Sequence, residues 1–198
     1  MKKTVCLLLA LMFVFLISGC KEKKEEKKQY TTDVDVEYYV NLGQMPEIKD
    51  YKLGYSVEDM LSEFAALESA ASEEAEAHSH DAFFYFINEG KEFTSISTSN
   101  AEFCYKNNNR EDGISCILSL DGAYGFSKDS IIIEVKEALS DYKVKEETVG
   151  EEGLPFMPVI KNADCLTYTF EKNKVTFVFV ENALCATAIY NADEWSLH

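Results

Sequence analysis

The sequence predicts an α+β protein built from two tandem helix-plus-antiparallel-sheet repeats. Two observations predict this fold class. An amphipathic helical pattern is followed by short strand patterns with polar breaks, and the same order recurs in the second half of the chain. Four of the six cysteines lie in predicted strands, two in each half. We expect an N-terminal unit with a leading arm at residues 30–122 and a C-terminal unit at residues 123–198. Two unrelated α+β units would produce the same pattern.

Each half contains one capped helical pattern. In the first, at residues 53–71, Ser56 is a good N-cap residue and Asp59 follows three positions later. In the second, at residues 127–142, the helix is expected to begin near Ser127 or Ser130. The apolar stripes of the two helices consist of Val57, Met60, Leu61, Phe64 and Leu67, and of Ile131, Ile132, Val135, Leu139 and Tyr142.

Strand patterns follow each helix. Four are expected in the first half and three in the second, where a loop containing Gly150 and Gly153 comes between the helix and the strands. The leading arm alternates acidic and apolar residues at positions 33–37, which is typical of an edge strand or an ordered arm. The seven strand patterns are AFFYFI, EFTSIST, EFCYK and GISCILSL, then CLTYTFE, KVTFVFVE and LCATAIY.

The N-terminal residues have the features of an export signal. Lys2 and Lys3 precede an apolar run at residues 5–17. The run is shorter than the roughly 20 residues of a permanent transmembrane helix, but it has the length and flanks of a secretory signal. It ends in the tetrapeptide ISGC, which resembles the lipobox of bacterial lipoproteins. The resemblance implies that residues 1–19 are removed and that the Cys20 thiol carries a diacylglyceryl group. The alternative is an ordinary signal peptide with a chance cysteine.

The segment after Cys20 is expected to be a charged tether, spanning residues 20–29. Residues 21–28 contain five lysines and three glutamates and no apolar side chain. Two acyl chains on one residue hold a protein stably at a membrane surface. The expected location is therefore the extracytoplasmic face of a cell membrane, with the folded body standing beyond the tether.

The charge of the body excludes nucleic-acid partners. The chain carries a formal charge of −16, and its first 28 residues hold seven lysines against three glutamates, so the remainder carries −20. Phosphate backbones would repel such a body. An envelope or secreted protein with a basic surface is the partner that this charge favours.

The four cysteines of the body suggest two disulfides, because disulfides persist in exported proteins. In a hairpin centred on Arg110, Cys104 and Cys116 fall opposite each other, within disulfide reach. By elimination Cys165 would pair with Cys185, although a simple meander places one strand between them. The alternative is that all four are free buried thiols.

The order of elements is similar to the β-lactamase inhibitory protein fold, which has two tandem helix-plus-sheet repeats with a disulfide in each. The second half also resembles small envelope lipoproteins in which a G-x-S-x-x-E-V helix start precedes a three-stranded sheet. Here the corresponding segment reads KDSIIIEV, with Lys128 where a glycine is usual and with one extra residue. The resemblance covers roughly residues 50–195 and implies a protein-binding role through an open sheet face, without identifying the partner.

Catalytic residue sets are absent from the sequence. Ser140 to Lys143 match S-x-x-K, but neither S-D-N nor K-T-G occurs, and there is no G-x-S-x-G or H-E-x-x-H. His78 and His80 lie among acidic residues that resemble zinc ligands, but the spacing fixes no third ligand. The sequence therefore predicts a non-enzyme without cofactor or resident metal. The alternative function is a metal- or small-ligand-binding lipoprotein that uses these histidines.

The aromatic residues of the strands are the remaining candidates for function. An aromatic patch with an acidic rim forms a protein-binding surface in many complexes. The alternative is that the rings belong to the core, since the face of an unpaired strand cannot be assigned. The expected binding face consists of Phe84, Tyr85, Phe86, Tyr105 and Tyr168.

Overall fold

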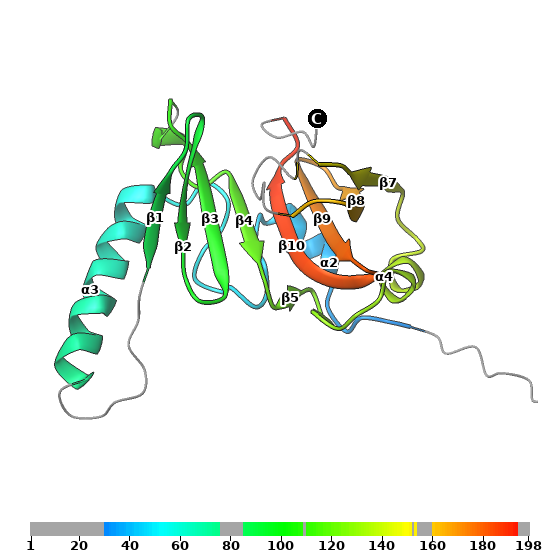
Figure 1. Ribbon diagram of the computed structural model, residues 1–198, viewed down its shortest axis with the longest axis horizontal. Coiled ribbons are helices and arrows are strands. Elements are labelled where there is room, and N and C mark those ends of the chain that lie inside the picture. Colours follow the sequence, from blue (N-terminus) through cyan, green and yellow to red (C-terminus); the bar gives the residue numbers. More distant parts are fainter. Residues whose placement is uncertain (1–29, 76–84, 109, 152, 154–159, 194–198) are drawn as a thin grey trace, which may run out of the picture.

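Eight antiparallel strands form one continuous sheet in the computed structural model, which describes residues 30–75, 85–108, 110–151, 153 and 160–193 (Figure 1). The order across the sheet is β1-β2-β3-β4-β10-β9-β8-β7. The strands are β1 (Phe86–Glu89), β2 (Phe93–Ser97), β3 (Ala101–Lys106), β4 (Cys116–Ser119), β7 (Val144–Val149), β8 (Ala163–Thr169), β9 (Asn173–Val180) and β10 (Ala183–Asn191). The architecture is thus mixed α/β with a dominant antiparallel sheet.

The sheet consists of two meanders that meet at one seam. Strands β1 to β4 pair in chain order, and so do β7 to β10. At the seam β4 pairs with β10, from Cys116 opposite Tyr190 to Ser119 opposite Thr187. The short strands β5 (Gly122–Ala123) and β6 (Phe126–Ser127) form a separate ribbon in the connection between the meanders.

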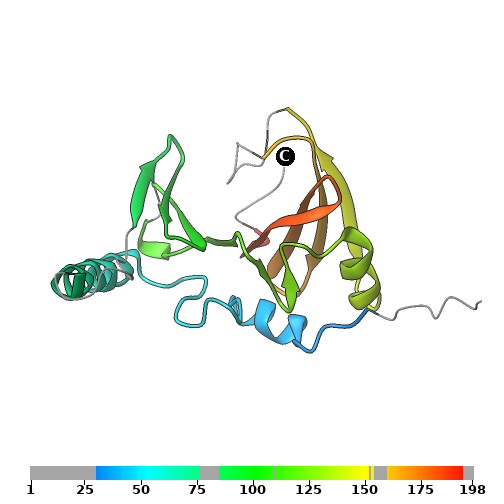
Figure 2. The ribbon, with the colours of Figure 1, turned by 60° about the horizontal axis from the view of Figure 1, so that its bottom comes forward.

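The helices and the segment between α2 and α3 lie against one face of the sheet. Figure 2 shows α2 (Val36–Asn41), α3 (Val57–Ala75) and their connection running beneath the strands. The larger apolar core forms between this layer and the sheet, and it includes Val40, Phe64, Phe103 and Phe177. A smaller apolar cluster lies on the opposite face. The remaining helices are α4 (Ile132–Ala138) and the 3-10 turn η1 (Arg110–Asp112).

Helix α3 agrees with its predicted start and with most of its predicted stripe. The Ser56 hydroxyl accepts a hydrogen bond from the Asp59 N–H at 3.2 Å, which satisfies one of the free donors of the first turn. Val57, Met60 and Phe64 are buried against the sheet. Leu67, the last residue of the predicted stripe, is 47% exposed and lies outside the core.

Helix α4 is shorter than the predicted helix at residues 127–142. Its start is delayed because the preceding residues serve other elements. Ser127 belongs to β6, and Ile131 forms a bridge with Ala183 of β10. The region after α4, expected to be a loop, contains β7. This strand was missed because half of its sequence VKEETV is charged and because it lacks the apolar alternation of a half-buried strand.

The leading arm forms helix α2 rather than an edge strand. Asp35 caps it by accepting a hydrogen bond from the Tyr38 N–H at 3.0 Å. Val36 and Val40, four residues apart, are both buried, which matches helical spacing. The amide of Asn173 on β9 donates to the Val40 carbonyl at 2.8 Å. The arm, expected to accompany the N-terminal unit, therefore packs on the C-terminal meander.

Tyr124 holds the arm against the connection between the meanders. Its side chain is fully buried, and its backbone has a φ of 58°, which is unusual for a bulky residue. Its hydroxyl donates to the Gln44 carbonyl at 2.9 Å, while its own carbonyl accepts from the Thr32 hydroxyl at 2.6 Å. These two bonds compensate the cost of this backbone conformation and of burying a hydroxyl.

The seam contains a polar atom whose removal should stabilise the protein. Thr187 on β10 is fully buried, and its hydroxyl has no hydrogen-bond partner among the described residues. An unsatisfied buried hydroxyl costs about 1–3 kcal/mol. Thr187→Val keeps the shape and removes that cost, so the free energy of unfolding in urea should rise by about 1 kcal/mol.

A matched control lies on the neighbouring strand. Thr176 on β9 is equally buried, but its hydroxyl is 2.8 Å from that of Thr167 and 2.9 Å from that of Tyr190. Thr176→Val should therefore lower the free energy of unfolding by about 1–3 kcal/mol. Equal destabilisation by both substitutions would contradict this account of the seam.

Candidate functional site

The two edges of the sheet differ in how well they resist pairing with another strand. The edge strand β7 carries Lys145, Glu146 and Glu147, and charges on an edge strand discourage further pairing. All three charges take part in ion pairs, Lys145 with Glu147 at 2.8 Å and Glu146 with Lys136 of α4 at 2.6 Å. The other edge strand, β1, has the sequence FINE and is exposed along its whole length. Among the described residues, no strand pairs with the outer side of β1.

The backbone of β1 offers two residues to a partner strand. The Gly90 N–H donates to the Phe93 carbonyl at 2.8 Å, which closes the β1–β2 hairpin. Hydrogen-bonded and non-hydrogen-bonded pairs alternate along an antiparallel ladder. Counting back from Gly90, Phe86 and Asn88 point their backbone groups toward β2. Ile87 and Glu89 consequently point theirs toward the open edge.

The first two residues of β1 place one apolar side chain on each face of the sheet, and the polar Asn88 and Glu89 follow them. Phe86 is 67% exposed and Ile87 is 47% exposed. Tyr85, just before the strand, is half-buried and packs its ring 5.5 Å from that of Phe64 on α3. Of the expected binding-face residues, Phe86 is thus the one whose ring lies free at the surface, while Phe84 lies outside the described residues.

The expectation that Tyr105 and Tyr168 belong to an exposed binding face is wrong. Tyr105 is 7% exposed and Tyr168 is 1% exposed, and both belong to the core beneath the sheet. Tyr168 packs edge-on against Phe177 with the ring centroids 6.1 Å apart. Both tyrosines point to the face that the helices cover, and sequence alternation alone cannot tell which face that is.

The four cysteines of the body lie on one face of the sheet. They contribute to the small apolar cluster opposite the helices, and no disulfide joins them in the structure. Cys104 on β3 stands directly opposite Cys116 on β4, as the hairpin centred on Arg110 predicted. Cys165 on β8 and Cys185 on β10 have β9 between their strands. Cys185 falls at a β-bulge between Leu184 and Ala186.

The thiols have the character of structural cysteines. Burial raises the pKa of the Cys116 thiol well above its ordinary value, and contact with Cys104 adds to the rise. Burial, followed by the charge of Glu147, raises the pKa of the Cys165 thiol to about 12. Reactive cysteines have lowered pKa values. The buried thiols therefore suit packing in the apolar cluster better than nucleophilic chemistry.

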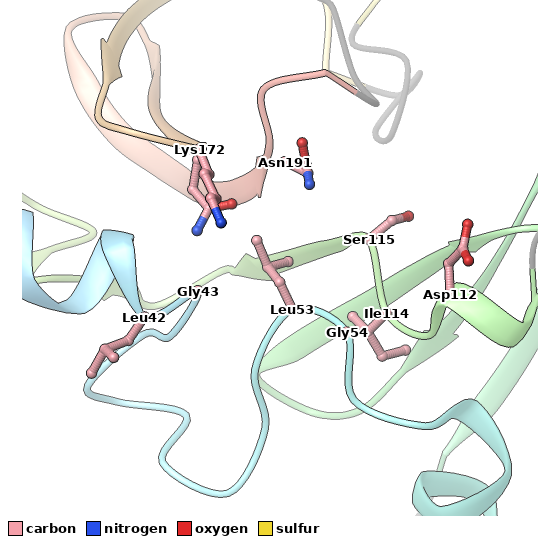
Figure 3. Close-up of a pocket in the computed structure, with 10 residues that line it drawn as sticks. Leu42, Gly43, Leu53, Gly54, Asp112, Ile114, Ser115, Lys172 and Asn191 are labelled. Atoms are coloured by element: carbon pink, nitrogen blue, oxygen red, sulfur yellow. The ribbon is translucent and has the colours of Figure 1, made fainter.

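A cleft opens where the two meanders meet the connection between α2 and α3 (Figure 3). Its wall is built by backbone hydrogen bonds, from the Gly54 N–H to the Ile114 carbonyl at 2.7 Å and from the Ile114 N–H to the Tyr55 carbonyl at 2.9 Å. Figure 3 shows Leu53 pointing between Lys172 and Asn191 on one side and Ser115 on the other. The lining residues are Leu42, Gly43, Leu53, Gly54, Asp112, Ile114, Ser115, Lys172, Asn173 and Asn191.

The size and polarity of this cleft limit what it can hold. Its volume is about 240 Å³, below the roughly 300 Å³ at which pockets for small organic ligands begin. Lys172 and Asp112 are both exposed and bring opposite charges to its rim. Asn173 is already committed to the Val40 carbonyl. The cleft is therefore a junction between the meanders rather than a built ligand site.

Several predicted residues lie outside the described part of the chain, namely Cys20, His78, His80 and Phe84. Within the described residues, no three histidine, cysteine or acidic side chains gather in a way that could hold a metal ion. The described helices are also too short or too polar to cross a bilayer. No protein-family model, curated protein or solved structure matches this chain.

Proposed function

We propose that this chain is a lipid-anchored extracytoplasmic protein that binds a protein partner without catalysis. The lipobox-like residues before Cys20 and the charged tether after it support the location. The open apolar edge of β1 supports the binding role. The sequence also contains no G-x-S-x-G, H-E-x-x-H, S-D-N or K-T-G motif, and the thiols of Cys116 and Cys165 have raised pKa values.

The observation that carries the binding role is the difference between the two edge strands. Peptide-binding domains often extend a sheet by adding a strand of the partner to an exposed edge. Such a strand could bond to the outward backbone groups of Ile87 and Glu89 and cover the side chains of Phe86 and Ile87. The charge of −20 on the body favours a partner segment with a basic surface. The proposed occupant is an extended basic segment of an envelope or secreted protein.

A proline on β1 should block strand addition without disturbing the sheet. Ile87→Pro removes one outward N–H, and proline is tolerated on edge strands where its missing N–H faces solvent. A photoreactive phenylalanine analogue at Phe86 of the full chain, in the producing cell, should cross-link one envelope or secreted protein. The yield of that adduct should fall at least about tenfold with Ile87→Pro, because a lost hydrogen bond of about 1 kcal/mol is joined by a steric clash.

Two controls make this experiment decisive. Ile87→Thr keeps the backbone N–H and should keep most of the adduct. The same analogue at Ile133 of α4, which is 44% exposed, should give none of it. An adduct that survives Ile87→Pro, or that forms equally from Ile133, would argue against strand addition at β1.

Membrane anchoring should depend on a single side chain. Cys20→Ser removes the thiol that the lipobox resemblance assigns to acylation. The variant should lose labelling by radioactive palmitate and leave the membrane fraction, because the tether alone binds anionic lipids weakly and reversibly. The matched control is Cys6→Ser within the signal segment, which should leave labelling unchanged. Labelling that persists in Cys20→Ser would refute the lipid anchor.

Export supports a disulfide between Cys104 and Cys116. Opposed residues of an antiparallel pair lie within bridging reach, and an exported chain meets an oxidising environment. Protein isolated from the envelope without reductant should therefore yield a peptide cross-linked between these two residues. Reduction should lower the free energy of unfolding by about 3 kcal/mol. Free alkylation of both thiols in the unfolded, unreduced protein would contradict the bridge. Cys165 and Cys185 remain the second pair by elimination.

We also propose that the two meanders with their helices are repeats of one unit, as in the β-lactamase inhibitory protein fold. The element order supports this, because α3 precedes four meandering strands and α4 precedes four more. The last strands of the two units, β4 and β10, then pair with each other. The shared fold would place binding on the sheet, but it does not name the partner.

A further inference from the structure

A second surface pocket lies beside α3, and none of its lining residues belongs to β1. Its volume is about 480 Å³, within the range of pockets that hold small organic ligands or large side chains. The connection between α2 and α3 supplies one wall and α3 supplies the other. The lining residues are Asp50, Tyr51, Tyr55, Glu63, Ala66 and Leu67.

Two tyrosine rings form the aromatic wall of this pocket, and the core holds them in place. The ring of Tyr51 makes edge-to-face contacts with Phe64 at 5.6 Å and with Phe103 at 5.2 Å. The ring of Tyr55 stands at 90° to that of Tyr51, with the centroids 5.3 Å apart. Because Phe64 and Phe103 are buried, the orientation of the wall is set before any ligand arrives.

Glu63 is fixed between the two tyrosines. The Tyr55 hydroxyl donates to its Oε1 at 2.6 Å, and the Tyr51 hydroxyl donates to its Oε2 at 3.2 Å. Each carboxylate oxygen has a second lone-pair direction left for another donor. In the described part of the chain, neither Glu63 nor Asp50 takes part in an ion pair. The pocket therefore presents two uncompensated carboxylates beside two aromatic rings.

These carboxylates contribute to raised pKa values of the two tyrosines. Burial, followed by the hydrogen bond to Glu63, raises the pKa of Tyr51 to about 12. The pKa of Tyr55 is also raised. The hydrogen bond to Glu63 is the largest cause, followed by burial and then by the charges of Glu63, Asp59 and Asp50. Negative potential at the pocket disfavours a phenolate and, by the same sign, favours a bound cation.

These features point to one ligand chemistry. We propose that this pocket binds an organic cation, a guanidinium or alkylammonium group. Aromatic faces attract such cations, and a carboxylate adds charge-assisted hydrogen bonds that are bidentate for guanidinium. Ala66 and the half-exposed Leu67 provide apolar surface for the aliphatic stem of the ligand. The site stands whether or not a partner adds a strand to β1, so the two proposals fail separately.

The group can arrive as a free small molecule or as an arginine or lysine side chain of a protein. The test uses the full chain in maltoside micelles, which carry no ammonium groups. The probes are choline, arginine capped at both termini, the same compound with citrulline, and an arginine-containing decapeptide with its citrulline counterpart. Binding is followed by NMR shifts of the Ala66 and Leu67 methyl groups and by calorimetry.

The charged probes should bind and the neutral isosteres should not. Capped arginine is expected to bind with a Kd of about 1 mM, and its citrulline analogue at least about tenfold more weakly. A decapeptide that binds at least about tenfold tighter than capped arginine identifies a protein side chain as the source. Equal affinity for choline, capped arginine and the peptide identifies a free cation. Equal affinity for arginine and citrulline, or no shift with any charged probe at about 10 mM, overturns the proposal.

Three substitutions locate the binding. Glu63→Gln and Tyr55→Leu should each weaken capped arginine at least about tenfold, through loss of the charge and of the ring respectively. Glu58→Gln removes the same charge from the same helix but outside the pocket, so it should change the Kd less than about twofold. Glu63→Gln keeps the packing of the core and carries the test if Tyr55→Leu unfolds. If Glu58→Gln and Glu63→Gln raise the Kd of capped arginine equally, the binding reflects only the overall negative charge, and the proposed site is refuted.

Discussion

The pairing of β4 with β10 is the interaction on which the rest of the molecule depends. It joins two four-stranded meanders into one sheet, from Cys116 opposite Tyr190 to Ser119 opposite Thr187. Separate meanders would each expose a further edge of unpaired backbone groups, which is costly and prone to aggregation. The seam is secured from below, where α2 packs on β9 and Tyr124 binds the arm and the connection between the meanders. The buried hydroxyl of Thr187, which has no hydrogen-bond partner among the described residues, destabilises this pairing.

One continuous sheet leaves two edges, and their chemistry assigns them different roles. Ion-paired charges discourage pairing at the β7 edge, whereas β1 begins with two exposed apolar residues and is unpaired on its outer side among the described residues. The helical layer fills the covered face, so the aromatic residues of β3 and β8 stabilise the core rather than bind a partner. The two proposed binding surfaces both lie at the periphery of the N-terminal meander, at β1 and at the tyrosine pocket beside α3. Lipid anchoring through Cys20 would present both surfaces outside the membrane.

The sequence predicted those parts of the fold whose signals are local. Ser56 marked the start of α3, and the hairpin centred on Arg110 gave the register of Cys104 and Cys116. It failed where tertiary contacts override the local pattern. The acidic and apolar alternation of the arm resembles a strand, but burial of Val36 and Val40 in the core and the hydrogen bond from Asn173 of β9 to the Val40 carbonyl hold it as a helix. Strand β7 has no apolar alternation because it is an edge strand whose charged residues discourage further pairing. The faces of Tyr105 and Tyr168, and the pocket formed by Tyr51 and Glu63, depend on packing between segments far apart in the chain.

Amide hydrogen exchange along β1, followed by NMR on the full chain without a partner, tests the central claim most directly. If the edge is open, the outward N–H groups of Ile87 and Glu89 exchange at close to the unprotected rate. Those of Phe86 and Asn88, which point to β2, exchange measurably more slowly. Strong protection of Ile87 and Glu89 would show that this edge is already occupied and would contradict a docking role for β1.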